Sequence, residues 1–129
     1  MKAEQREMVE NLIESLKKEH NAVILVEGMR DYQALKRLGV TCPMEKVSGK
    51  RIFDFLVPER FQGKNIIILT DFDRRGHELF EKIKTELEVL GLNPNCYYWQ
   101  QLKTLLKGNM TSIEELSHFS EDETENGHL

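Results

Sequence analysis

The stretch IIILTDFDRRGHELF, residues 66–80, passes from four consecutive apolar residues to two aspartates and two arginines. A short, continuous, β-branched run is typical of a strand that is buried on both faces of a parallel sheet. Asp71 and Asp73 follow this run, and side chains at i and i+2 of an extended segment point to the same side. Two like charges held together cost free energy, so the pattern leaves three alternatives: a metal ion, a helix N-terminus or solvent.

A second apolar run, AVILV at 22–26, leads directly into Glu27. Ligands of open α/β sheets bind beyond the carboxyl ends of the strands. If the two strands are neighbours, Glu27 joins Asp71 and Asp73 at one edge, and such crowded carboxylates require a cation. Oxygen ligands favour Mg²⁺, with Mn²⁺ as the alternative ion. Either motif alone is better read as structural, but their joint placement predicts a metal site on these three acids.

The residues around the acids suit a phosphate ligand. Gly28 and Gly76 allow the backbone to approach a ligand closely. Arg74 and Arg75 stand just ahead of a predicted helix N-terminus, where a phosphate that also contacts the metal is expected to bind. Lys50 is a third candidate for neutralising charge on that phosphate.

Competing sites find less support in the sequence. The chain has neither GxxxxGK[ST] nor GxGxxG, which disfavours a P-loop and a dinucleotide fold. No serine lies in a nucleophile-elbow context, and no histidine has metal-ligand spacing. We interpret His77, the histidine nearest the acids, as a surface residue rather than a catalytic one. Tyr97, Tyr98 and Trp99 are interpreted as strand and core residues first and as a base-stacking surface second.

Strands alternate with helices along the chain, which predicts an α/β fold with a mainly parallel sheet covered by helices. The predicted strands are 22–26, 45–49, 65–70 and 95–99, the last at the sheet edge. The predicted helices are 4–20, 30–38, 50–57, 78–90, 100–108 and 111–119, the last opening on a capping box of Thr111 and Glu114. We expect residues 1–20 to form a helix packed on one domain, 21–119, with a disordered acidic tail at 120–129.

Composition is that of one globular domain: 129 residues, 40% apolar and 31% charged. The apolar runs are too short to span a bilayer, the N-terminus is no secretory signal, and Cys42 and Cys96 form no CxxC, so a cytoplasmic protein without membrane contact is expected. The net charge is −4, but residues 112–129 hold six acids and no Lys or Arg, and the rest of the chain carries +2. A nucleic-acid partner therefore remains compatible with the charge.

VILVEGMRDYQAL at 23–35 and IIILTDFDRRGHEL at 66–79 resemble the Toprim domain family, the metal-binding module of topoisomerases, bacterial-type primases and related nucleases. The resemblance covers about residues 21–107, and its local form is most similar to small stand-alone Toprim proteins and the nuclease that matures 5S ribosomal RNA. It implies about four parallel strands, Mg²⁺ on the DxD acids, and Glu27 as general acid or base. Asp31, three residues after Gly28, and Gly76 match further positions, whereas Arg75 stands where some topoisomerases carry a third acid.

Three hypotheses about function follow. The first is a Mg²⁺-dependent enzyme acting on nucleic-acid phosphodiesters, a nuclease for structured RNA such as an rRNA precursor, or for DNA. The second is a non-catalytic Toprim module that binds nucleic acid or serves as a subunit of a protein complex. The third makes the acidic tail the active element, as a mimic of a polyanion or as a segment that docks on a basic partner. Topoisomerase and primase activities are disfavoured, because they require additional domains.

Overall fold

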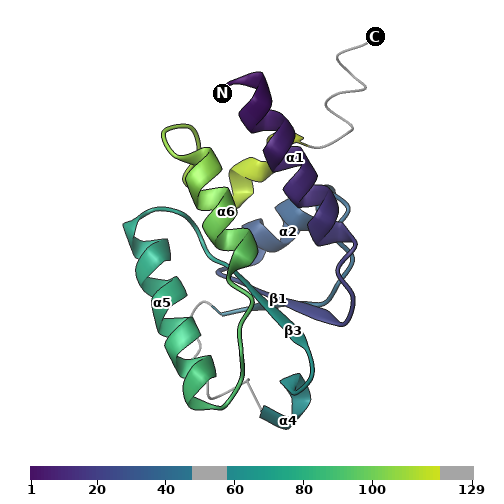
Figure 1. Cartoon of the computed structure of the whole chain (residues 1–129), viewed down its shortest axis with the longest axis vertical. Helices are drawn as coiled ribbons and strands as arrows, with labels where there is room; N and C mark the ends of the chain where they lie inside the picture. The colour runs from purple at the N-terminus through teal and green to yellow at the C-terminus, as the bar shows by residue number, and fades with distance from the viewer. Residues whose placement is uncertain (48–57, 120–129) are drawn as a thin grey trace.

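Two buried strands lie side by side at the centre of the fold, β1 (Ala22–Val26) and β3 (Asn65–Leu69) (Figure 1). They are parallel, and β2 (Met44–Lys46) pairs with the other side of β1, also in parallel. Val26 lies opposite Leu69 in the register, so both central strands end at the same level. The residues that follow them therefore meet at one edge of the sheet, as the apolar runs predicted.

The computed structural model describes residues 1–47 and 58–119. The helices within these ranges are α1 (Ala3–Lys17), α2 (Met29–Arg37), α4 (Pro58–Phe61), α5 (Arg74–Val89), α6 (Tyr97–Leu106) and the 3₁₀ helix η1 (Glu114–Phe119). None of them is both long and apolar enough to cross a membrane. The α/β class with a parallel sheet and flanking helices is confirmed.

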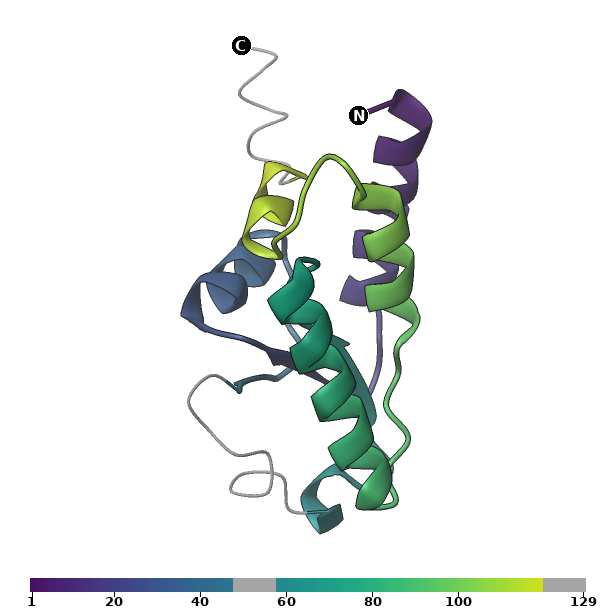
Figure 2. The same ribbon diagram turned by 90° about the vertical axis from the view of Figure 1, so that its left-hand side faces the viewer.

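The helices pack in pairs around the sheet. α1 packs on α6 and α2 packs on η1, and Figure 2 shows these two pairs on opposite sides of the molecule. The hydroxyl of Tyr98 in α6 makes hydrogen bonds to Ser15 in α1 and to Glu19, which follows α1. Between α5 and α6, the rings of Phe80 and Trp99 stack with centroids 3.9 Å apart. These contacts fix α6 against both its helical neighbours.

The predicted edge strand at 95–99 is wrong. Asn95 makes a single parallel bridge to Ile67, and α6 begins two residues later. Four side chains of α6 are buried at helical spacing: Tyr98, Trp99, Leu102 and Leu106. Burial of this face outweighs the preference of aromatic residues for strands. The sheet within the described residues consequently has three strands, one fewer than predicted.

Two helix starts also differ from prediction. α5 begins at Arg74 rather than at 78, because the Asp73 carboxylate caps it by accepting the N–H of Gly76 at 2.7 Å. The capping pair before η1 is Ser112 with Glu115, one residue later than predicted: the Ser112 hydroxyl accepts the N–H of Glu115 at 3.3 Å. The predicted helix at 50–57, Lys50 within it, and the tail at 120–129 lie outside the described residues.

Candidate active site

Glu27 and Asp71 meet at the carboxyl edge of the sheet. The backbone N–H of Asp71 donates a hydrogen bond to Glu27 Oε1 at 3.2 Å. This contact follows from the register, since Glu27 comes directly after β1 and Asp71 comes two residues after β3. The structure thus brings together the acids of the two sequence motifs, which lie 44 positions apart.

The segment 111–113, just before η1, also contacts Asp71 and its neighbour, and the sequence did not predict this contact. Asp71 Oδ1 accepts the backbone N–H of Ile113 at 2.8 Å, and the next residue, Phe72, donates its N–H to Thr111 O at 2.7 Å. In both contacts at least one partner is a backbone group about 40 positions away, so no pattern of side chains in the sequence predicts them. The segment before η1 is therefore part of the site.

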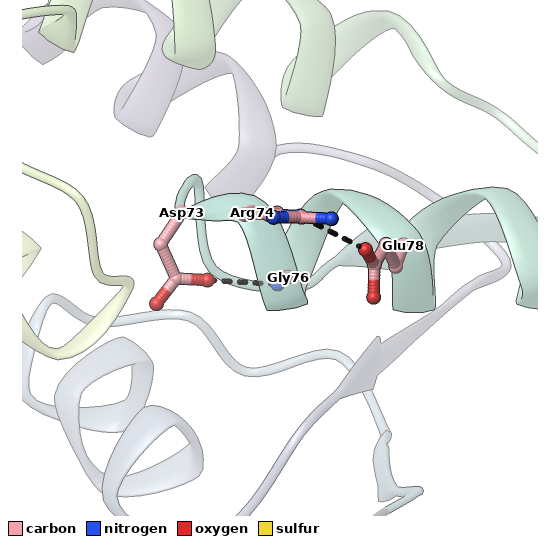
Figure 3. Close-up of polar contacts among 4 residues, drawn as sticks. All are labelled: Asp73, Arg74, Gly76 and Glu78. Carbon is pink, nitrogen blue, oxygen red and sulfur yellow. Dashed lines mark hydrogen bonds and ion pairs between the residues drawn. The ribbon is translucent and has the colours of Figure 1, made fainter.

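Asp73 is the N-cap of α5. Figure 3 shows its carboxylate turned back to the backbone N–H of Gly76, the contact that gives α5 its first turn. The side chain is otherwise exposed. Of the alternatives that the opening stretch leaves for its acids, the helix N-terminus is the one that this structure realises for Asp73.

Gly76 lies against the backbone of Asp71. A Cβ on Gly76 would stand 2.0 Å from Asp71 O, a distance that no real carbon–oxygen contact permits. The Gly76 carbonyl in turn accepts a hydrogen bond from Thr70 Oγ1 at 2.8 Å. The glycine was expected to make room for a ligand, but in the structure it makes room for the turn that carries the two aspartates.

Asp31 lines the same cavity as Glu27 and Asp71. Its Oδ2 accepts the N–H of Gly28 at 3.2 Å at the start of α2, and only 7% of the residue is exposed. A cavity of about 320 Å³ is lined by Glu27, Gly28, Met29, Arg30, Asp31, Asp71 and Glu114. Glu114, from η1, is a fourth acid at this cavity that the sequence analysis did not single out.

Burial and mutual repulsion raise the pKa of these carboxyls. Burial is the largest cause for Glu27, whose pKa is further raised by the charges of Asp71 and Asp73. Burial also raises the pKa of Asp71, opposed by the hydrogen bond from Ile113. The pKa of Asp31 is raised to about 6, first by burial and then by the charge of Asp71. A bound cation would relieve all three of these costs.

Replacing Asp31 with Asn is expected to stabilise the protein at pH 7 and not at pH 4. Because the pKa of Asp31 is raised from 3.8 to about 6, the folded wild type loses stability as pH rises through this window. The amide keeps an acceptor for Gly28 but carries no charge. We expect a gain of about 2 kcal/mol at pH 7, measured by urea unfolding with a chelator present. Glu88→Gln, at an exposed acid, is the control, and equal stability of Asp31→Asn and wild type at pH 7 would contradict the argument.

The two arginines of the opening stretch differ in position. Arg74 lies along α5, with its Nε 3.3 Å from Glu78 Oε1 and its side chain 94% exposed (Figure 3). The charge of Arg75, in contrast, acts on Glu27 and lowers its pKa. Of these two arginines, Arg75 is the one whose charge acts on Glu27, while Lys50 lies outside the described residues.

The donor set of the site suits a hard divalent cation. Glu27, Asp71 and Asp73 each use one carboxylate oxygen to accept a backbone N–H, and their second oxygens have no hydrogen bond within residues 1–47 and 58–119. No three His, Cys, Asp or Glu side chains in those ranges stand close enough together to hold a metal ion. Mg²⁺ typically takes only one or two carboxylates and completes its shell with water and phosphate, so the arrangement fits it.

Comparisons with known proteins agree with these features. A family model described as the Toprim domain matches residues 22–101. The chain is similar to a UPF0292 protein of Thermococcus sibiricus, with 38% identity over 116 residues that cover 90% of each chain. It is also similar to a UPF0292 protein of Methanosarcina acetivorans, with 32% identity over 85% of this chain and 78% of the relative.

A solved structure, a putative protein from Aquifex aeolicus, matches with a TM-score of 0.69 and 34% sequence identity. It covers 81% of this chain, and 94% of its own length is matched. Toprim domains typically bind divalent metal ions such as Mg²⁺ and take part in reactions of nucleic acids. The family match therefore indicates a metal-binding, nucleic-acid-related role.

Proposed function

The chain belongs to the Toprim domain family, and we propose that it is a metal-dependent nuclease that cleaves phosphodiester bonds in nucleic acid, with structured RNA as its first candidate substrate. The observation that carries this proposal is the contact between Glu27 and Asp71 at the carboxyl edge of the parallel sheet. This contact supports the proposal because Glu27, whose pKa is raised, lies next to Asp71, a proposed metal ligand.

Asp71 and Asp73 are the proposed metal ligands, directly or through water, by the carboxylate oxygens that accept no backbone N–H. Bound there, Mg²⁺ would supply positive charge to a phosphate oxygen of the substrate. The backbone contacts on the other oxygens hold both carboxylates in place before any ligand arrives, so little ordering free energy is spent on binding.

Glu27 is the proposed general acid or base. Its Oε1 is fixed by the N–H of Asp71, and the second oxygen is the one available to the leaving or attacking oxygen of the phosphodiester. The raised pKa of Glu27 brings proton transfer closer to neutral pH. Arg75 is the proposed contact for the non-bridging phosphate oxygens.

The test is cleavage of labelled RNA and DNA panels, both single-stranded and structured. We expect Mg²⁺ to support cleavage by the wild type, a chelator to stop it, and the Asp71→Asn variant to be inactive with Mg²⁺. The amide of Asn can still accept the N–H of Ile113, so this variant should remain folded. Cleavage by Asp71→Asn at the wild-type rate would overturn the assignment.

Replacing the two arginines separately distinguishes their roles. Arg75→Gln is expected to lower the cleavage rate by about 10- to 100-fold, because a charge that acts on Glu27 and the phosphate is lost. Arg74→Gln is the matched control on the neighbouring position and removes only an exposed pair with Glu78, so the rate should change by less than about threefold. Equal losses in both variants would contradict the assignment of Arg75.

A second function, a non-catalytic Toprim module that binds nucleic acid, is favoured by two observations. The three carboxylates form no metal-holding group in the part of the chain that the structure describes, and Asp73 serves as a helix cap. This alternative predicts salt-sensitive binding of RNA or DNA without metal-dependent turnover. The same panels decide between the two functions when binding and cleavage are both measured.

A further inference from the structure

A second cavity, of about 680 Å³, lies between α5 and α6. Its lining combines apolar and basic side chains: Phe72, His77, Phe80, Glu81, Trp99, Gln100, Lys103, Thr104, Lys107 and Met110, with Gly108 and Thr111. A volume of this size is typical of small-ligand pockets, which combine apolar walls with a few polar groups that orient the ligand. None of the roles proposed above uses this cavity.

The walls of this cavity are aromatic. The ring of Trp99 stacks on Phe80 and has the rings of Phe72 and His77 at centroid distances of 6.0 and 5.5 Å. The indole Nε1 already donates to Thr70 O at 2.9 Å, and Trp99 is only 3% exposed, so the ring lies behind the cavity wall and supports the side chains that face the cavity. Phe72 is only half-buried, so part of its ring is accessible to a planar ligand.

The rim of the cavity carries positive charge. The ammonium of Lys103 donates to His77 Nδ1 at 2.7 Å and lies 4.9 Å from the centroid of the Trp99 ring. Lys107 follows one helical turn later on the same face, and Glu81 is the one acid among the lining residues. When Nδ1 accepts from Lys103, a neutral His77 carries its proton on Nε2, and this N–H and the two lysines are groups that can bind a phosphate.

One turn of the chain connects the cavity with the acid site, although the linings of the two cavities share no residue among those the structure describes. Phe72, which lines it, stands between Asp71 and Asp73, and the Phe72 N–H is bonded to Thr111 O. The same loop continues through Ile113, which holds Asp71. A ligand seated on Phe72 is therefore one residue away from both of the proposed metal ligands.

We propose that the cavity between α5 and α6 binds an unpaired nucleotide of a nucleic-acid strand, with its base packed against the half-buried Phe72 and Met110, next to the buried Trp99, and its phosphate at Lys103 and Lys107. A base in a duplex cannot enter, because both its faces are stacked on neighbouring bases. The nucleotide would adjoin the phosphate that reaches Asp71. This inference rests on the proposed function and specifies it, since it makes a single-stranded segment beside the scissile bond the element that is recognised.

Trp99 makes the proposal directly measurable, because it is the chain's single tryptophan and lies next to the side chains that face the cavity. The experiment titrates the full chain with a single-stranded oligonucleotide, a duplex of the same sequence, a nucleoside monophosphate and inorganic phosphate, all with a chelator present. Trp99 fluorescence is excited at the red edge of its band, where nucleotides do not absorb. Anisotropy of a labelled oligonucleotide gives a second, independent readout.

We expect saturable quenching of Trp99 by the single strand, weaker binding of the monophosphate, and no quenching by the duplex. The Lys103→Gln/Lys107→Gln variant should raise the Kd for the single strand by about tenfold or more. The control, Lys18→Gln/Lys82→Gln, removes two exposed lysines that do not line the cavity and should bind as the wild type does, apart from a small general salt-dependent loss.

Four outcomes would overturn the proposal: no saturable change in Trp99 fluorescence, equal quenching by duplex and single strand, equal effects of phosphate and nucleotide, or binding of the monophosphate alone. The experiments can reject the nucleotide site and the proposed nuclease activity independently of each other. Absent quenching with intact Mg²⁺-dependent cleavage removes only the nucleotide site. Quenching by the single strand in a wild-type chain that cleaves no substrate with Mg²⁺ supports the nucleotide site and removes the nuclease.

Discussion

Replacing Glu27 with Gln is expected to lower the rate of Mg²⁺-dependent cleavage by about 10²- to 10⁴-fold while the protein stays folded. The amide oxygen of Gln can still accept the N–H of Asp71, so the contact between the two strand ends survives. What is lost is the group that exchanges a proton. The free energy of unfolding should change little, and if anything rise, since a partly buried charge is removed.

The pH dependence of cleavage supplies a sharper signature of the same substitution. The pKa of Glu27 is raised above its ordinary value of 4.5, chiefly by burial. If Glu27 acts as the base, the wild-type rate falls as pH drops through this pKa; if it acts as the acid, the rate falls as pH rises through it. In either case the limb that belongs to Glu27 should be missing from the profile of the Gln variant.

The matched control for this substitution is Glu78→Gln, which removes an exposed carboxylate from the nearby first turns of α5. It should leave both the rate and the pH profile unchanged. Glu27→Gln with the full wild-type rate, or with an unchanged profile, would mean that Glu27 transfers no proton. Its contact with Asp71 would then be structural, and this result would support the non-catalytic alternative.

The two central strands and the acids at their ends were predictable because their signal is local. The short, continuous apolar runs at 22–26 and 66–69 are typical of buried strands. Because the two parallel strands pair in register, the residues that follow them meet at one edge of the sheet. A helix was predicted at 100–108, but its start at Tyr97 was not predictable in this way. Its first residues are aromatic and favour strands, and only the packing of Trp99 on Phe80 and of Tyr98 on α1 decides the outcome.

Some features of the candidate site were likewise predictable from the sequence, and others were not. Glu27 and Asp71 follow from motif spacing. The hydrogen bond to Asp71 from Ile113, in contrast, is donated by a backbone N–H that almost any residue at position 113 would supply. Asp73 was predicted as a carboxylate facing a ligand, and its additional role as N-cap depends on where α5 begins. Arg74 and Arg75 are equivalent in the sequence and separate only when the helix sets their directions.

Gly76→Ala is expected to destabilise the protein by about 3 kcal/mol or more and to reduce cleavage together with stability. Two effects of the added methyl group oppose each other. Alanine favours a helix over glycine by about 1 kcal/mol. The methyl group would, however, stand 2.0 Å from Asp71 O, and that neighbour is backbone, which cannot rotate aside as a side chain could. Steric overlap outweighs helix propensity, and thermal unfolding should move down by about 10 °C.

Gly91→Ala, at the other end of α5, separates this overlap from the general cost of replacing a glycine. A Cβ at Gly91 meets nothing within 4 Å, but its φ of +79° strains a side chain, so a loss of about 1 kcal/mol is expected. A Gly76→Ala variant as stable as the wild type would show that α5 can move away from Asp71. Because Asp73 caps that same first turn, such a shift would also displace one of the proposed metal ligands, and a stable variant should then still bind Mg²⁺ more weakly.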